Sequence, residues 1–304
     1  MRICRLGLES LLLHKRESIK FTAMRETEEK YISLLTDFGF KRIFGTEFNK
    51  SLLISFLNSL FDGEQVIRDV MYHNSEHVGD VYAERKAIFD VYCENERGEK
   101  FIVEMQNAYQ AHFKDRSLFY STFPIREQAQ KGAIWDYKLS HVYVVALLNF
   151  NMSDPAFSDS SINHDVALLD KETHIVFNDK LTFKYIEIAK FNKTEDELET
   201  DFDKWLYVLK NLSRLDRQPQ HLQNEVFNRL FKEAAIAKFS KNELREYENS
   251  LKAYRDIKNC VDSAKQEGRE EERTEVTKRL LTMGLPIEDI AKATGLSIDD
   301  IKSI

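Results

Sequence analysis

The fold is decided by one stretch, Ile88-Phe-Asp-Val-Tyr-Cys-Glu-Asn-Glu-Arg-Gly-Glu-Lys-Phe-Ile-Val-Glu-Met-Gln106. Two runs of alternating apolar and polar residues flank a polar turn that contains a glycine, and this pattern predicts a β-hairpin. A three-residue loop, 96–98, with its glycine in the left-handed conformation pairs Asn95 with Glu99. In that register Asp90 lies opposite Glu104, with their Cβ atoms about 5 Å apart.

The hydrophobic pattern favours this register over its nearest alternative. A two-residue turn would place Asp90 opposite Met105 and mix polar with core positions. With the three-residue loop, Met105 joins Val91 on the buried face, and Gln106 points the same way as Glu104. We therefore expect the two acids and the glutamine on one face of the hairpin.

Two acids so close together suggest a metal site. Carboxylates at that separation repel each other or raise the pKa of one of them. A hard divalent cation removes this cost, because it binds through a few carboxylates, waters and phosphate oxygens. It also stabilises negative charge on a phosphate under attack. The alternative is a pair of solvent-facing acids on an open sheet.

The remaining pattern predicts an α/β core. Apolar residues at helical spacing cover 31–35 and 52–60, and a turn at 36–40 separates them, with Thr36 or Asp37 as a helix cap. A further helix is expected at 109–132. Strands are expected at 66–70, 86–93, 100–106, 141–149, 165–169, 174–177 and 181–188. The apolar run 141–149 is typical of a strand buried on both faces, in a sheet covered by helices.

Composition limits the class of protein. Of 304 residues 42% are hydrophobic, with 21 Phe and 12 Tyr, which supports a packed core rather than disorder. There are 44 basic and 51 acidic residues, a net charge of -7, which excludes binding of nucleic acid through bulk positive charge. Any function on DNA therefore needs a local site.

The cysteines and the apolar runs indicate a cytoplasmic location. Cys4, Cys93 and Cys260 lie far apart, so neither a disulfide framework nor a zinc site is expected. No apolar run approaches the roughly 18 residues that a membrane span needs. Residues 1–23 lack the later patterning, and we expect a non-core extension there, with Met24 as an alternative start.

The order of the motifs resembles a known family. Asp90 followed by Glu104-Met-Gln106 is similar to the D…(E)xQ form of the PD-(D/E)XK nuclease signature, in the branch of recombination-promoting nucleases and transposases. The likeness spans roughly residues 28–210. The other motifs that carry it are Leu35-Thr-Asp-Phe-Gly-Phe-Lys-Arg-Ile-Phe-Gly45, Arg116-Ser-Leu-Phe-Tyr120, Gln128-Ala-Gln-Lys-Gly132 and the strand within 137–150.

The resemblance implies a restriction-endonuclease-like core, a mixed central sheet flanked by helices, with a helical C-terminal region. It also implies a DNA endonuclease that hydrolyses phosphodiester bonds, linked to recombination or mobile elements. Asp90 and Glu104 would bind Mg²⁺ (or Mn²⁺), and Gln106 would stand where the wider superfamily has lysine. The alternatives are a catalytically inactive DNA-associated or assembly protein with the nuclease fold, and an unrelated helical interaction protein.

The glutamine changes what the site needs. A neutral amide cannot act as a base or supply positive charge. Lys41, Lys86 and Arg116 are the candidates for that charge, and Arg116 either contacts phosphate or packs. Asp37 contributes a further acid or caps a helix, and Tyr120 is expected to pack.

The C-terminal third has its own organisation. We expect a nuclease-like core at 24–192, a charged helical region at 193–275 and a small helix-turn-helix-like tail at 276–304. Pro286 and Ser297 suit helix starts, and Thr294-Gly-Leu-Ser297 resembles a tail seen in the family. Residues 286–304 carry two basic and four acidic side chains, a net of -2. This charge favours packing or homo-oligomerisation through the C-terminal helices over reading of DNA.

Overall fold

A six-stranded mixed sheet forms the centre of the computed structural model, which describes residues 29–77, 87–129, 136–157 and 159–304. Its strand order is β1-β4-β5-β6-β8-β7. The pairs β1–β4, β4–β5 and β7–β8 are antiparallel, whereas β5–β6 and β6–β8 are parallel. The strands are β1 (Val70–Tyr72), β4 (Val91–Asn95), β5 (Lys100–Gln106), β6 (Val142–Leu148), β7 (Asn163–Leu169) and β8 (Val176–Glu187). The α/β class with a mixed sheet is confirmed.

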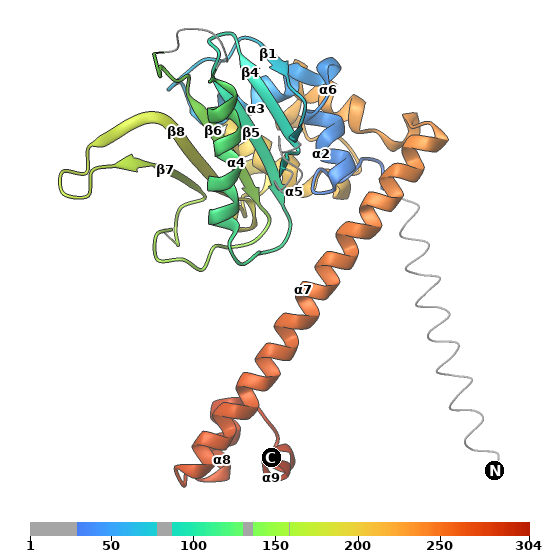
Figure 1. Ribbon diagram of the computed structural model, residues 1–304. Helices are drawn as coiled ribbons and strands as arrows, with labels where there is room; N and C mark the ends of the chain where they lie inside the picture. Colours follow the sequence, from blue (N-terminus) through green and yellow to red (C-terminus); the bar gives the residue numbers. More distant parts are fainter. Residues whose placement is uncertain (1–28, 78–86, 130–135, 158) are drawn as a thin grey trace. The chain divides into compact units, whose positions relative to one another are not determined.

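Helices cover both faces of this sheet (Figure 1). On one face α4 (Phe113–Glu127) packs over a core that contains Tyr92, Ile102 and Val144. On the opposite face Phe61 of α3 packs its ring 6.0 Å from that of Phe101 and 4.9 Å from that of Tyr143. The helices on this second side are α2 (Asp37–Phe44), α3 (Lys50–Phe61), α5 (Asp201–Asn211) and α6 (Glu225–Ala234).

The hairpin has the predicted register. Tyr92 pairs with Ile102 and Val91 with Val103. The backbone N–H of Asn95 donates to Glu99, at 2.9 Å, and that of Gly98 donates to Asn95, at 3.0 Å. Gly98 has a φ angle of +79°, a backbone conformation that residues other than glycine rarely adopt. The even-numbered residues of β5 therefore face α4, and the odd-numbered ones face α3.

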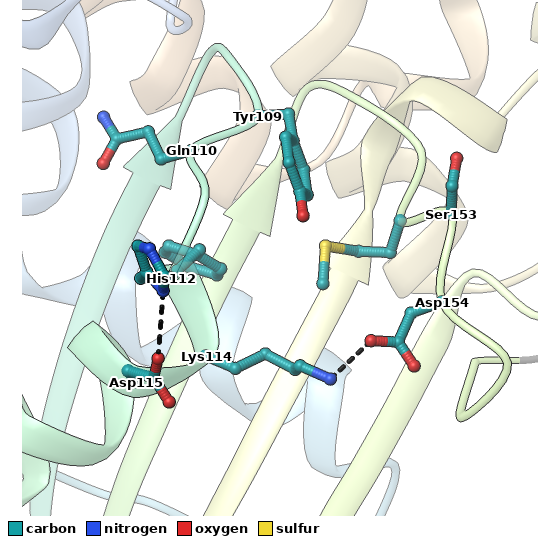
Figure 2. A pocket seen from close by; sticks show the side chains of 9 residues that line it. Tyr109, Gln110, His112, Lys114, Asp115, Ser153 and Asp154 are labelled. Atoms are coloured by element: carbon teal, nitrogen blue, oxygen red, sulfur yellow. Dashed lines mark hydrogen bonds and ion pairs between the residues drawn. The ribbon is translucent and has the colours of Figure 1, made fainter.

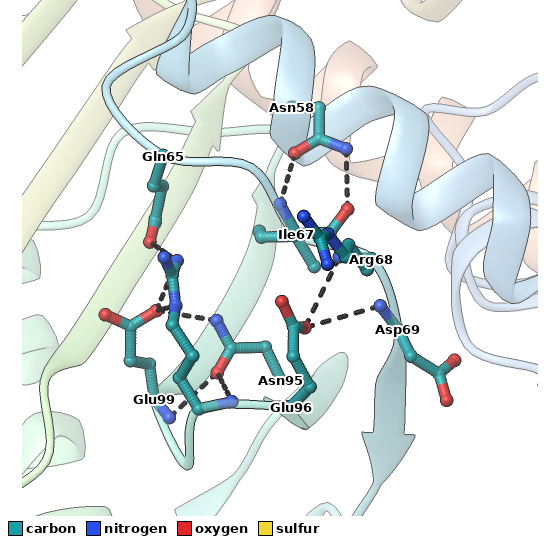
Figure 3. A network of polar contacts seen from close by, with 9 residues as sticks. Asn58, Gln65, Ile67, Arg68, Asp69, Asn95, Glu96 and Glu99 are labelled. Atoms are coloured by element: carbon teal, nitrogen blue, oxygen red, sulfur yellow. Dashed lines mark hydrogen bonds and ion pairs between the residues drawn. The ribbon is translucent and has the colours of Figure 1, made fainter.

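Polar side chains lock the turn of this hairpin in place (Figure 3). Asn95 Oδ1 accepts from the backbone N–H groups of Arg97 and Glu99, each at 3.0 Å. Arg97 reaches out to Gln65 in the segment before β1. Glu96 accepts from the N–H groups of residues 68 and 69, which bind the same segment to the turn. A slip of the register would break these contacts together.

The prediction of helix at 31–35 and a turn at 36–40 is wrong. Tyr31 forms a β-bridge with Ala235, and the Ile32 N–H donates to Ala234 at 3.0 Å. Residues 31–33 are extended, and a turn follows, in which the Thr36 N–H donates to the carbonyl of Ser33 at 3.3 Å. Helix α2 then begins at Asp37 with Thr36 as its N-cap. A short run buried on every side has the same apolar spacing in either state.

Three strand boundaries also differ from the predictions. The first strand begins at Val70 rather than at 66. The expected strand 86–93 is divided into β3 (Ala87–Ile88), which pairs with β2 (Glu76–His77), and β4, with a break at residues 89–90. The two strands expected at 174–177 and 181–188 are one continuous β8.

The described residues divide into two compact units, with the boundary between Lys252 and Ala253. Most of the second unit is helical, and Ile290, Ile301 and Thr277 are its buried residues. Pro286 and Ser297 lie at the starts of α8 and α9, as predicted. Its helices are the C-terminal part of α7 (Lys241–Thr282), α8 (Ile287–Thr294) and α9 (Ile298–Ser303). Among the described helices, none is both long enough and apolar enough to cross a membrane.

Candidate active site

The two hairpin acids meet where β4 and β5 separate. Asp90 lies in the break before β4, and its backbone N–H donates to Oε1 of Glu104 at 3.2 Å. In return Oδ2 of Asp90 accepts from the backbone N–H of Met105 at 2.8 Å. Side-chain oxygens thus replace the backbone acceptors that a continued ladder would provide. The arrangement holds both carboxylates on the α4 face of the sheet.

Burial and mutual repulsion disfavour two charges at this position. Glu104 is only 6% exposed. Burial first, and the charge of Asp90 second, raise the pKa of Glu104 to about 8. Burial also raises the pKa of Asp90, although the hydrogen bond from Met105 opposes this change. A bound cation would relieve the same cost.

Gln106 and Asn107 extend the site along the end of β5. Gln106 Nε2 donates to Oε2 of Glu104 at 3.3 Å, so its amide lies beside the second acid. Asn107 Nδ2 donates to the carbonyl of Leu35 at 2.7 Å. This bond ties the segment before α2 to the end of β5. It brings the first turn of α2 toward the acids.

Helix α2 contributes an ion pair at the edge of the site. Lys41 Nζ lies 2.7 Å from Oδ1 of Asp37, one helical turn away. Burial lowers the pKa of Lys41, but its hydrogen bond to Asp37 and the charges of Asp37, Asp90 and Glu104 outweigh this effect, and the net shift of the pKa is upward. Because Thr36 caps the helix, the Asp37 carboxylate is not used as the cap. It is committed to Lys41 instead.

Helix α4 brings two more predicted residues to the acids. The positive charge of Arg116 lowers the pKa of both Asp90 and Glu104. Burial and the charge of Glu104 raise the pKa of Tyr120. Tyr120 also packs its ring 5.1 Å from that of Phe89, in agreement with its predicted packing. Seven predicted side chains therefore gather at one place: Asp37, Lys41, Asp90, Glu104, Gln106, Arg116 and Tyr120. The eighth, Lys86, lies outside the described residues.

The donor set fits a hard divalent cation. Mg²⁺ in proteins is bound through one or two carboxylates together with waters and phosphate oxygens. Asp90 and Glu104 supply two carboxylates, and Gln106 has an amide oxygen nearby. Within the described part of the chain, no group of three or more His, Cys, Asp or Glu side chains is placed to hold a metal. The pair is thus suited to an ion that keeps part of its water shell, not to a closed structural site.

A pocket of about 200 Å³ lies at the start of α4, apart from these acids (Figure 2). Its charged side chains are already paired: Lys114 with Asp154, and His112 with Asp115 at 3.4 Å. Met152 and the ring of Tyr109 supply apolar lining. The pocket contains neither acid of the hairpin.

Two residues of the site were not anticipated from the sequence. Asn107 connects β5 to the segment before α2, and Gln110 accepts a hydrogen bond from Nη1 of Arg116. Asn107 follows the end of β5 directly, and Gln110 lies three residues further on. Polar residues immediately after a strand that carries acids are the only signal that would have found them.

Comparison with known proteins places the chain in one family. The family described as PD-(D/E)XK nuclease family transposase matches residues 34–264. The match includes α2, the complete hairpin, α4 and every strand of the sheet. No curated protein and no solved structure matches the chain.

Proposed function

Because the chain belongs to the PD-(D/E)XK nuclease family transposases, we propose that it is a metal-dependent endonuclease that hydrolyses phosphodiester bonds of DNA. Its six-stranded mixed sheet flanked by helices is the restriction-endonuclease-like fold. The observation that carries the proposal is the pairing of Asp90 with Glu104 across the open end of the hairpin. The family description points to DNA that takes part in recombination or in the movement of mobile elements.

Each site residue has a role in this proposal. Asp90 and Glu104 hold Mg²⁺ (or Mn²⁺), and Gln106 orients Glu104 through its amide. When bound, such an ion stabilises negative charge on the phosphate and makes water a better nucleophile. Lys41 stays paired with Asp37 at the edge of the site. Lys86 remains a candidate for a supporting charge.

The reaction is a hydrolysis. A new P–O bond forms from water, one ester P–O bond breaks, and the proton of the water ends on the leaving hydroxyl. A neutral Gln106 cannot accept that proton. The chain's own contribution is to hold the two carboxylates in place before the substrate binds, because both are fixed by hydrogen bonds to the backbone.

Plasmid cleavage tests the proposal. Purified wild-type protein is expected to nick or linearise supercoiled plasmid with Mg²⁺ or Mn²⁺ and to be inactive in EDTA. Asp90→Asn and Glu104→Gln should each lower the rate by at least about a hundredfold. Asp179→Asn is the matched control, because that acid lies on β8, outside the site, with its side chain 72% exposed. Undiminished cleavage by D90N would refute the site, and no cleavage by wild type would favour the inactive alternative.

The proposal includes a cytoplasmic location and self-association. Cys93 and Cys260, the described cysteines, are both free thiols, as a reducing compartment would require. In the second unit Met283 is 72% exposed and Ile298 is 41% exposed. These apolar side chains support homo-oligomerisation through the C-terminal helices. Light scattering should then give a multiple of 35.7 kDa, and M283E should reduce it.

A further inference from the structure

The guanidinium group of Arg116 has hydrogen-bond donors that the protein does not use. Nη1 donates to Oε1 of Gln110. Nε and Nη2 are buried and have no partner among the described residues. A buried donor without an acceptor costs about 1–3 kcal/mol, and native proteins seldom leave one unpaired unless a ligand or water completes it.

These two donors belong to the same edge of the planar group. That edge offers two parallel N–H bonds, and its usual partner is a pair of oxygens on a carboxylate or a phosphate. The carboxylates of Asp90 and Glu104 do not take this place, because Arg116 forms an ion pair with neither of them in the described structure. The Nε and Nη2 donors of Arg116 are therefore suited to an acceptor from outside the chain.

The surroundings of Arg116 indicate which acceptor this is. Its charge acts on both Asp90 and Glu104, so the guanidinium lies within electrostatic reach of the pair that is suited to a metal. The rings of Phe113 and Tyr120 flank it, with centroids 5.3 Å and 5.7 Å from Cζ. It also lines an open pocket of about 530 Å³ with residues 110–112, 115 and 119. A strand of nucleic acid can approach through that pocket.

We propose that Arg116 binds the phosphate group next to Asp90 and Glu104 through Nε and Nη2, and supplies the positive charge that Gln106 lacks. This assignment rests on the proposed nuclease function. It explains why a neutral amide is tolerated at 106, because the charge comes from helix α4 rather than from strand β5. Arginine is better suited than lysine to this place, since its planar fork engages two phosphate oxygens at once.

Two other cations among the described residues fit the role less well. Lys41 acts on the same acids, but its ammonium already holds Asp37 at 2.7 Å. Arg229 also has a buried, unpaired Nε, yet its guanidinium lies 4.7 Å from the ring centre of Phe48 and its Nη2 donates to the carbonyl of that residue. An unpaired donor alone therefore does not identify a phosphate-binding arginine. Arg116 differs from Arg229 because its unpaired donors occur together with the acid pair.

The salt dependence of DNA binding measures this contact directly. In the D90N background, which is expected not to cleave, a fluorescein-labelled DNA duplex is titrated in a series of KCl concentrations. Loss of one phosphate contact should lower the slope of log K against log salt by about 0.9. We expect this change for D90N/R116A. The matched control is D90N/R126A, which removes an exposed arginine from the same helix about 15 Å away.

Cleavage assays test whether Arg116 acts through its two parallel N–H donors or only through its positive charge. R116A should lower kcat at least about a hundredfold, while calorimetry should still detect Mn²⁺ binding, because both carboxylates are kept. R116K should keep the salt slope and still lose most of the cleavage, because lysine keeps the charge without the fork. Circular dichroism establishes that the variants are folded. If R116A does not fold, R116Q serves the same comparison.

Each outcome decides one of the two claims. An unchanged salt slope for D90N/R116A, or an equal change for D90N/R126A, overturns the role of Arg116 even when wild type cleaves DNA. Full cleavage by R116A overturns it as well. If wild type fails to cleave with any metal, the nuclease proposal fails, and the salt slope still decides whether Arg116 binds phosphate.

Discussion

The backbone N–H of Asp90 donates a hydrogen bond to the side chain of Glu104, 3.2 Å away on the facing strand. The second acid is therefore held by the main chain of the first. The Met105 N–H completes the exchange by donating to Asp90. Such a pair is positioned before any ligand arrives, which is the condition for an effective metal or phosphate site.

Addition of a divalent cation should stabilise the folded protein. A ligand that binds only the folded state at about ten times its Kd adds about 1.4 kcal/mol, or about 3–6 °C in Tm for a unit of this size. The rise is expected with Mg²⁺ or Mn²⁺ in thermal unfolding of wild type. It should be absent in D90N, and D179N should behave as wild type. Equal stabilisation of D90N would place the ion elsewhere.

Lysine at position 106 should compensate for the loss of Arg116. Gln106 lies next to Glu104, so Q106K adds a positive charge to the same site from β5. We expect R116A/Q106K to cleave at least about tenfold faster than R116A, corresponding to about 1.4 kcal/mol of transition-state stabilisation. The double-mutant cycle is measured from kcat values of the four proteins. Strict additivity would show that the two positions do not serve one phosphate.

Stability should fall as the pH drops from 6.5 toward 4, partly because of His141. Burial lowers the pKa of His141 from its ordinary value of 6.5 to about 4. A depressed histidine pKa means that the unfolded chain binds the proton first, so this contribution is complete above 6.5 and is lost as the solution is acidified.

The variant H141F isolates this contribution. Its ring can keep the stacking on Tyr143, where the centroids are 3.8 Å apart, and cannot titrate. Urea unfolding at pH 7 and pH 4.5 should show a smaller acid-induced loss for H141F than for wild type. Parallel losses would mean that other groups cause the whole decline.

Two glycine substitutions should have opposite effects. A Cβ at Gly39 would lie 2.1 Å from the carbonyl oxygen of Ser33 and 2.9 Å from Thr36 Oγ1, so the start of α2 must shift. We expect G39A to lose about 1–3 kcal/mol and to reduce cleavage, because α2 carries Asp37 and Lys41. Gly268, in the middle of α7, has open space around it, and G268A should gain up to about 1 kcal/mol. Thermal unfolding compares the two, and a stable, active G39A would contradict the close contact.

The sequence predicted correctly those features of the fold that depend on residues close together in the chain. The register of the hairpin follows from alternation and from a glycine turn, both contained in 88–106, and it was confirmed to the residue. Tyr31 and Ile32 are extended because they pair with the segment after α6, some 200 positions later, and no short window contains that information. The break at Asp90 also depends on a partner outside the hairpin, because β3 pairs with β2 rather than continuing into β4.

In the candidate site, too, relations within the hairpin were predictable from the sequence, and relations between distant segments were not. The relation of Asp90 to Glu104 and Gln106 is a property of one hairpin, so spacing was enough to propose it. The approach of Lys41 and Arg116 depends on how α2 and α4 pack, which the sequence does not state. The bond from Asn107 to Leu35 is what brings α2 near, and only the folded chain reveals it.

The break at Asp90 has a consequence for how such proteins can diverge. Asp90 lies outside the strands, and the sheet is held by pairings that do not involve its side chain. In the proposed enzyme, catalysis and architecture are therefore separable: a single substitution at position 90 would abolish the reaction and leave the sheet intact.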